Sequence, residues 1–336
     1  MAWILAGLAA LAMAAEGPYK VLKTAKVGGP GGFDYVYADS TDRKLYVPRS
    51  GNPGRVMVYN LDTLAQEGEI PEAKGVHGAA VSDKTHHGFA SSNPVLMWDT
   101  KTLKTIKTID VQGSPDGIMH DDFNDRVYIF SHRAPNATVI NPADGSIVGT
   151  IDLGGAPEQA ASDGKGHIYV DLEDKDNIAV IDAKTLQVTG HYDLTGKGGQ
   201  CAGLAMDTKN RILFAACRNP QNMVILNADD GKILETLPIG AGTDGAVFNP
   251  KTMEAFSSQR DGTLTVVKEN SPTSFAVEQT VQTMTGAKTS TLDSKTGHVY
   301  LIAAEYGAPT APPKEGGRGG RAPMVPDSFT ILVVGK

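Results

Sequence analysis

The chain has 336 residues and a formal net charge of −7, with a pI near 5.6. This acidic balance argues against nucleic acid or an anionic membrane as the main partner, since either would require a clustered basic surface. The length alone would allow two domains, so the number of domains has to come from the pattern within the chain.

The first fourteen residues are apolar and end in Ala12-Met13-Ala14, a small-x-small pattern typical of a secretory cleavage site. They predict a signal peptide over residues 1–14 and a periplasmic or secreted protein. No basic residue precedes the apolar run, and an apolar N-terminal strand is the alternative. The run is too short to span a bilayer as a helix, so we expect no transmembrane segment in the mature chain.

A turn-forming Asp or Asn next to an apolar strand recurs every 39 to 44 residues. The seven positions are Asp39, Asp83, Asp122, Asp163, Asp207, Asn249 and Asp293. Within each unit the apolar runs are short and β-branched, as in 45–47 and 56–59, and turn residues separate them. A period of this length predicts a β-propeller blade, so the chain is expected to be an all-β, seven-bladed β-propeller.

Repeat architectures bury one continuous core, which predicts a single domain over residues 19–336. Its approximate blades are 33–75, 76–114, 115–156, 157–198, 199–242, 243–286 and 287–336. The last unit ends in its third strand, whereas residues 20–29 align with 104–113, the fourth strand of the second unit. We therefore expect residues 19–28 to complete the seventh blade, which closes the ring without an open sheet edge.

The two cysteines, Cys201 and Cys217, flank the first hairpin of the fifth unit, with its turn midway between them. Their side chains should face each other across the ladder. In an oxidising compartment this predicts a disulfide. Two buried thiols, or a metal or catalytic thiol, are the alternatives.

Several phrases of the sequence resemble the YncE-like, or YVTN-type, seven-bladed propellers, and the match covers essentially the whole mature chain. Examples are 43–47 (RKLYV), 75–78 (GVHG), 114–117 (SPDG), 126–130 (RVYIF), 167–175 (HIYVDLEDK), 262–267 (GTLTVV) and 329–335 (FTILVVG). The resemblance implies an exported propeller. It implies little about activity, because most such proteins have no assigned reaction and a fold does not determine a function.

Propeller geometry places the D-to-A and B-to-C connections of all blades on one face, around the central axis. Six D-to-A connections offer a charged residue there, and Cys201 stands in the seventh: Asp34, His77, Asp116, Glu158, Asp244 and Lys288. The ends of the second strands add a further rim: Arg49, His132, Arg133, Asp171, Glu173, Arg218, Arg260 and Glu305. Turn chemistry alone can explain an Asp in Pro-Asp-Gly. Charge concentrated at one repeat position, where carboxylates repel each other, favours a ligand or metal site.

A Gly/Pro-rich insertion, residues 306–326, interrupts the last unit on the same face. Such a loop is typical of a lid or a partner-binding segment, and an inert surface loop is the alternative.

Two functions follow. The first is a monomeric binding module of the cell envelope that holds a small molecule or an envelope protein through the charged funnel. The second is a metal-assisted hydrolase or lyase, by fold-level analogy with gluconolactonase and streptogramin-lyase propellers. In that case Asp34, Asp116, Glu158 and Asp244 would bind Ca²⁺ or Mg²⁺, with His77 as general base and Lys288 or Arg218 at the oxyanion.

Overall fold

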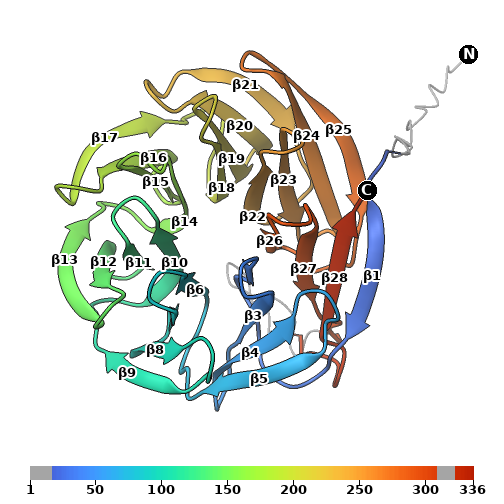
Figure 1. Ribbon diagram of the computed structural model, residues 1–336. Coiled ribbons are helices and arrows are strands. Elements are labelled where there is room, and N and C mark those ends of the chain that lie inside the picture. The colour runs from blue at the N-terminus through green and yellow to red at the C-terminus, as the bar shows by residue number, and fades with distance from the viewer. Residues whose placement is uncertain (1–16, 309–321) are drawn as a thin grey trace, which may run out of the picture.

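The computed structural model describes residues 17–308 and 322–336, and these form seven four-stranded antiparallel sheets around a central axis (Figure 1). No helix occurs within the two described ranges, so no helix there could cross a membrane. The first strand of each sheet lies nearest the axis and the fourth forms the outer rim. The architecture is the seven-bladed β-propeller that the repeat predicts.

The strands follow one order in every blade, from the axis outwards. Blades one to four consist of β2 (Tyr37–Asp39), β3 (Lys44–Arg49), β4 (Arg55–Asn60) and β5 (Gln66–Pro71); β6 (Ala79–Ser82), β7 (His87–Ala90), β8 (Val95–Asp99) and β9 (Thr105–Ile109); β10 (Pro115–Asp121), β11 (Arg126–Ser131), β12 (Asn136–Asn141) and β13 (Ser146–Asp152); β14 (Pro157–Ser162), β15 (His167–Leu172), β16 (Asn177–Asp182) and β17 (Gln187–Asp193). Blades five to seven consist of β18 (Cys201–Asp207), β19 (Ile212–Arg218), β20 (Gln221–Asn227) and β21 (Ile233–Pro238); β22 (Thr243–Asn249), β23 (Glu254–Gln259), β24 (Thr263–Ser271) and β25 (Ser274–Gln282); β26 (Ser290–Leu292), β27 (Val299–Ala303), β28 (Thr330–Gly335) and β1 (Lys20–Lys26).

The repeated Asp and Asn residues cap the turns between the first and second strands. Asp39 Oδ1, for example, accepts hydrogen bonds from the backbone amides of Thr41 (3.0 Å) and Asp42 (2.9 Å). The same side-chain-to-backbone bonds occur at Asp163, Asp207, Asn249 and Asp293. In the second and third blades the capping residues are Ser82 and Asp121, one position before the residues that the sequence period suggests. The repeat therefore reflects turn chemistry, a structural role.

The hydrophobic core lies between neighbouring sheets. Tyr128 and Phe130 of blade three, for instance, belong to the same buried cluster as Ile168 and Val170 of blade four. The closing pair of blades has its own cluster, which joins Val47 to Ile331 across the ends of the chain. Each fully buried side chain of this size contributes about 1.5–3 kcal/mol, so every blade is stabilised by both neighbours.

The N-terminal strand closes the ring, as predicted. Strand β1 pairs antiparallel with β28, from Lys20 opposite Gly335 to Lys26 opposite Thr330. Just before β1, the backbone of Tyr19 exchanges two hydrogen bonds with the Gln279 side chain, of 2.9 and 2.8 Å. The Tyr19 hydroxyl donates to the buried Glu254 carboxylate, which also holds Lys336 Nζ at 2.8 Å. Both ends of the chain are thus anchored to blade six.

Replacing Tyr19 with Phe should lower the free energy of unfolding by about 1.5 kcal/mol, because the variant loses a hydrogen bond to a charged group. Lys336→Gln should cost less than about 1 kcal/mol, since that side chain is 43% exposed and its ion pair is screened. Urea unfolding of both variants provides the measurement. An equal or larger loss in Lys336→Gln would show that the anchor does not depend on the tyrosine.

Candidate functional site

Local strand geometry aims the charged residues toward the axis. At the start of the first strand in blades three to six the pairing register shifts, which marks a β-bulge. Asp116, Glu158 and Asp244 occupy these bulges, so the Asp of Pro-Asp-Gly lies in a strand and not in a turn. Bulges commonly re-aim a side chain beside a site. A Cβ on Gly117, the residue after Asp116, would lie 2.8 Å from the Glu158 carbonyl oxygen, so neighbouring strands approach too closely there for any larger residue.

The pairing register corrects one expectation. Cys201 lies opposite Cys217, just as Thr243 lies opposite Gln259, so the bulged residue of blade five is Ala202. Blade five therefore has no charged residue at the bulge of its first strand. The side chain of Arg218, at the end of β19, supplies the missing charge from the same blade.

Eight side chains form a closed circuit in which acids and bases alternate. We call this set the charge ring; it consists of Asp34, His77, Asp116, His132, Glu158, Arg218, Asp244 and Lys288. Each base lies within 4.0 Å of two acids, and each acid within 4.0 Å of two bases. The carboxylates thus have basic side chains between them, and Arg218 and Lys288 balance part of their charge within the protein.

One half of the charge ring is closely paired. His77 Nδ1 lies 2.9 Å from Asp34 Oδ2 and 3.2 Å from Asp116 Oδ1. Lys288 Nζ donates to Asp34 Oδ1 at 2.9 Å and to Asp244. Burial opposes ionisation of Asp34, but the hydrogen bond from His77 and the charge of Lys288 outweigh it and hold the Asp34 pKa below its usual value. The hydrogen bond to Asp34 in turn raises the pKa of His77.

The other half of the charge ring is less well paired. His132 Nε2 lies 3.4 Å from Asp116 and 3.5 Å from Glu158, too far for good hydrogen bonds. Burial raises the pKa of Asp116, and it raises that of Glu158 well above the usual range, reinforced by the charges of Asp116 and Glu173. Tyr35, which the sequence analysis missed, donates its hydroxyl to Glu158 Oε2 at 2.9 Å. This hydrogen bond lowers the pKa of Glu158, but burial outweighs it.

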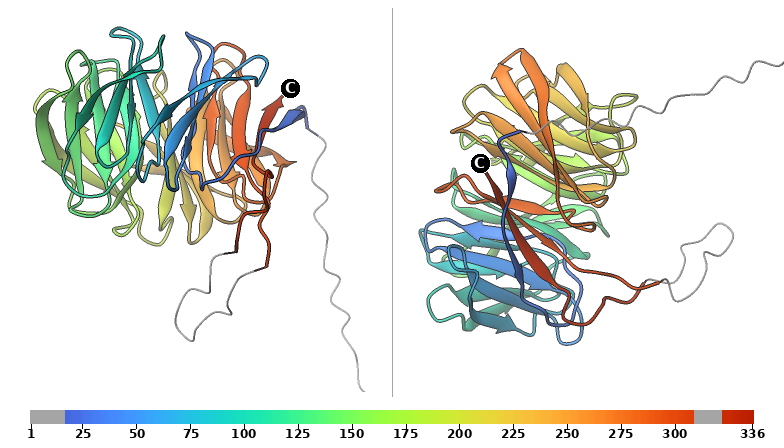
Figure 2. Two further views of the ribbon diagram at one scale, coloured as in Figure 1. Left: turned by 90° about the horizontal axis from the view of Figure 1, so that it is seen from below. Right: turned by 90° about the vertical axis from the view of Figure 1, so that its right-hand side faces the viewer.

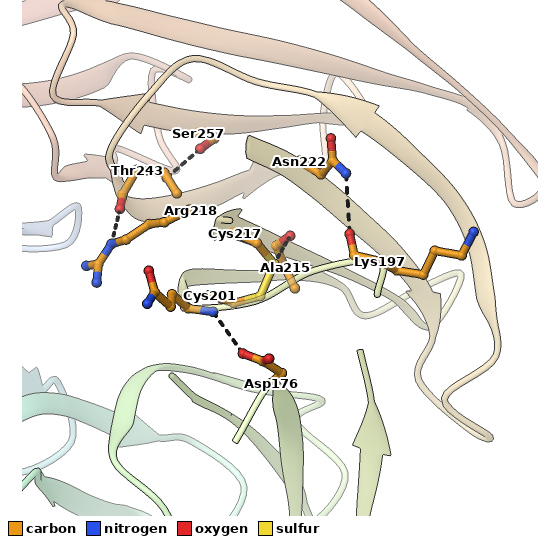
Figure 3. The surroundings of a disulfide bond; sticks show 10 residues. Asp176, Lys197, Cys201, Ala215, Cys217, Arg218, Asn222, Thr243 and Ser257 are labelled. Carbon is orange, nitrogen blue, oxygen red and sulfur yellow. Dashed lines mark hydrogen bonds between the residues drawn. A yellow bond between two sulfur atoms is a disulfide. The ribbon is translucent and has the colours of Figure 1, made fainter. Parts of the chain in front are cut away.

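Arg218 is the most connected base of the charge ring. Its Nη1 donates to Glu173 at 2.9 Å, and its Nη2 contacts Asp244. Its Nε donates to the Thr243 carbonyl oxygen at 2.9 Å (Figure 3). The preceding residue, Cys217, forms the predicted disulfide with Cys201 across β18 and β19. The bond fixes the strand end from which Arg218 projects.

The remaining sequence-predicted residues lie elsewhere. Arg49 is 1% exposed, donates to the carbonyl oxygens of residues 28, 29 and 31, and lies over the Phe329 ring. Its burial lowers its pKa to about 10. Asp171 is fully buried, neither carboxylate oxygen has a hydrogen-bond partner among the described residues, and burial raises its pKa well above the usual range. Arg133 and Glu305 are exposed, and no ion pair is found for either within the described ranges.

Within residues 17–308 and 322–336, two groups of atoms could hold a metal. The ligand atoms of Asp34, His77 and Asp116 all lie within 4.8 Å of one another, as do those of His132, Glu158 and Glu173. The four carboxylates that the sequence grouped as oxygen ligands are instead separated by the bases, and Asp244 contacts Lys288 and Arg218. Mixed imidazole and carboxylate ligands suit Zn²⁺ or another transition metal better than Ca²⁺ or Mg²⁺.

Two hollows flank the charge ring. The axial cavity, of about 420 Å³, is lined by six members of the ring together with Gln200, Gly242 and Arg260. The side pocket, of about 570 Å³, lies beneath the base of the insertion and is lined by Gly32, Phe33, Asp34, Ser50, His77, Arg260, Gly286, Lys288, Tyr306 and Ala322. Figure 2 shows the two described ends of the insertion leaving one face of the propeller. Residues 309–321 of the expected lid lie outside the described residues.

We expect the fold to lose stability as the pH rises through the pKa of His77. That pKa lies above its unfolded value near 6.5, so between the two values the folded protein holds a proton that the unfolded chain has lost. The stabilisation is therefore complete only below about pH 6.5. Asp34, Asp116 and Lys288 are the charged groups that face His77. Melting temperatures measured from about pH 6 to about pH 8 should fall less in His77→Gln than in the unmodified protein. Parallel profiles would contradict this assignment.

The sequence matches no protein-family profile and no curated protein. Among solved structures, a chain in the "Crystal Structure of Mitotic Checkpoint Complex" is similar, with a TM-score of 0.72 over 90% of this chain and 95% of that chain. The two sequences are 13% identical, so the likeness shows the fold alone. The protein is a seven-bladed β-propeller, and its ligand has to be argued from the site.

Proposed function

We propose that the protein is an exported, YncE-like binding propeller that holds a small polar ligand over the charge ring. The observation that carries this proposal is the axial cavity of about 420 Å³, whose walls are formed mainly by ion-paired side chains. Its volume falls in the range of small-molecule sites, about 300–1,000 Å³. Walls that present both carboxylates and cations favour a ligand that carries groups of both signs.

Binding is a better fit to the charge ring than catalysis. A general base needs a nitrogen that is available to a substrate proton. His77 Nδ1 lies between Asp34 and Asp116, and the hydrogen bond to Asp34 raises the pKa of His77, which favours the protonated imidazolium that cannot accept a proton. Lys288 Nζ likewise contacts two carboxylates, Asp34 and Asp244. Groups held by several partners are pre-organised, which lowers the entropic cost of binding.

Export rests on the predicted signal peptide, residues 1–14, which lie outside the described residues. The disulfide supports it, because such bonds persist in oxidising compartments. Cell fractionation with N-terminal sequencing of the mature protein tests the point. The expected result is an extracytoplasmic protein that begins just after residue 14. An intact N-terminus on cytoplasmic protein would refute export.

A thermal-shift screen of small polar metabolites against three proteins tests the binding proposal. Asp116→Asn changes a carboxylate of the axial cavity, whereas Asp122→Asn makes the same change at an exposed carboxylate outside it. We expect compounds that stabilise the unmodified protein and Asp122→Asn but stabilise Asp116→Asn less. If no compound separates the two variants, the small-ligand proposal is wrong and an envelope protein becomes the partner to seek.

A metal-assisted hydrolase or lyase is the second candidate, favoured by the convergence of Asp34, His77 and Asp116. These residues fit a metal by ligand type, although Lys288 already contacts Asp34. Elemental analysis for Zn, Mn, Ca and Mg, on protein purified without chelators, tests this candidate. Near-stoichiometric metal that Asp116→Asn lacks would favour it, and metal-free protein would refute it.

A further inference from the structure

The side pocket beside the charge ring differs from the axial cavity in its chemistry. Its walls include two aromatic side chains, Phe33 and Tyr306, and the Tyr306 side chain is 50% exposed. Phe33 is half-buried and packs against Phe329, with 5.2 Å between the ring centroids. One wall can therefore receive an apolar or aromatic group.

Arg260 is the residue that links the two hollows, because it lines both. Its backbone is held on two sides: its amide donates to the Gly242 carbonyl oxygen at 3.0 Å, and its carbonyl oxygen accepts from the Gly286 amide at 2.8 Å. The side chain is exposed, and within the described ranges no carboxylate lies within 4.0 Å of its guanidinium. Arg218 and Lys288, by contrast, are each paired with at least two carboxylates.

Among the described lining residues, the side pocket therefore has a cation without a counter-charge. The acid among them, Asp34, is already shared between His77 and Lys288 at 2.9 Å each. The pocket also contains Ser50, whose hydroxyl can donate to a ligand. A guanidinium binds a carboxylate through two parallel hydrogen bonds, which gives both affinity and orientation.

We infer that the side pocket binds an organic carboxylate with an aromatic or apolar body, with the carboxylate on Arg260 and the body against Phe33 and Tyr306. This inference rests on the proposed binding function and names a ligand class for one part of the face. The volume of about 570 Å³ accommodates a ligand the size of an aryl or acyl acid.

Fluorine NMR titration with 4-fluorophenylacetate, and with the neutral 4-fluorophenylacetamide, tests the inference on the mature protein. We expect the acid to bind and the amide to bind far more weakly. Arg260→Gln should weaken binding of the acid about tenfold to a hundredfold, the loss expected for a charged hydrogen-bonded pair. Arg260→Lys keeps the positive charge but not the planar guanidinium, so its affinity for the acid should lie between those of the unmodified protein and Arg260→Gln. Arg133→Gln is the matched control, since Arg133 is also exposed and follows the second strand of blade three outside the pocket.

Failure of the acid to bind the unmodified protein would overturn the inference, as would equal binding of the amide or unchanged affinity in Arg260→Gln. Arg260→Gln should keep the melting temperature of the unmodified protein, because its side chain makes no ion pair within the described ranges. The metabolite screen separates this failure from failure of the proposed function. If compounds bind in a way that depends on Asp116 but not on Arg260, the proposed binding function stands and only the inference of a carboxylate site in the side pocket is wrong.

Discussion

Lys288→Met is expected to lower the free energy of unfolding by about 3 kcal/mol. Methionine keeps most of the volume of lysine, so the loss comes from charge. The lysine side chain is 15% exposed and lies between Asp34, at 23%, and Asp244, at 9%. Without the ammonium, two largely buried carboxylates face each other with less compensation.

Chemical unfolding of three variants provides the test. Lys84→Met is the matched control, because Lys84 is 77% exposed and its pair with Asp125 spans 3.4 Å, so this change should cost less than about 0.5 kcal/mol. Lys288→Met/Asp244→Asn should recover part of the loss by removing one of the repelling charges. Equal stability of the two single variants would show that the charge ring does not contribute to folding.

Replacing both cysteines with serine should cost about 3 kcal/mol. The bond closes a loop of 16 residues, and its loss increases the conformational freedom of the unfolded chain. Cys201 and Cys217 are 3% and 0% exposed, so the serine hydroxyls would also be buried.

The measurement is urea unfolding of the double variant beside the unmodified protein, with and without a reductant. Reductant should destabilise only the unmodified protein, and mass spectrometry of the alkylated protein counts the free thiols. If reduction leaves the unfolding midpoint unchanged, the disulfide does not hold the fifth blade.

The fold followed from the sequence because it depends on local signals that repeat. Turn-capping side chains recur in each unit, and the likeness of residues 20–29 to an outer strand matches strand β1, which pairs with β28 as the fourth strand of blade seven. The disulfide was predictable for a similar reason, since the turn lies midway between Cys201 and Cys217 and ladder pairing then places them opposite each other.

The site could be predicted only in part, because it depends on bulges and on contacts between blades. A single extra residue in β18 moves the ring position from Cys201 to Ala202, and no local pattern marks that shift. Arg49 is the last residue of a second strand, just as Arg218 is, yet its guanidinium donates to backbone carbonyl oxygens of the loop at residues 28–31. The sequence feature that could have placed Tyr35 at the site is its position next to Asp34.

The charge ring also disfavours a propeller with a different number of blades. Acids and bases alternate only if each side chain keeps its position around the axis. The ion pair between Asp34 and Lys288 joins the first blade to the seventh. A chain that closed with one blade displaced would bring acid to acid or base to base at the seam, with a buried charge left without a partner. The same side chains that face the axial cavity therefore disfavour a ring of the wrong size, so specificity of assembly and the polarity of the cavity come from one set of residues.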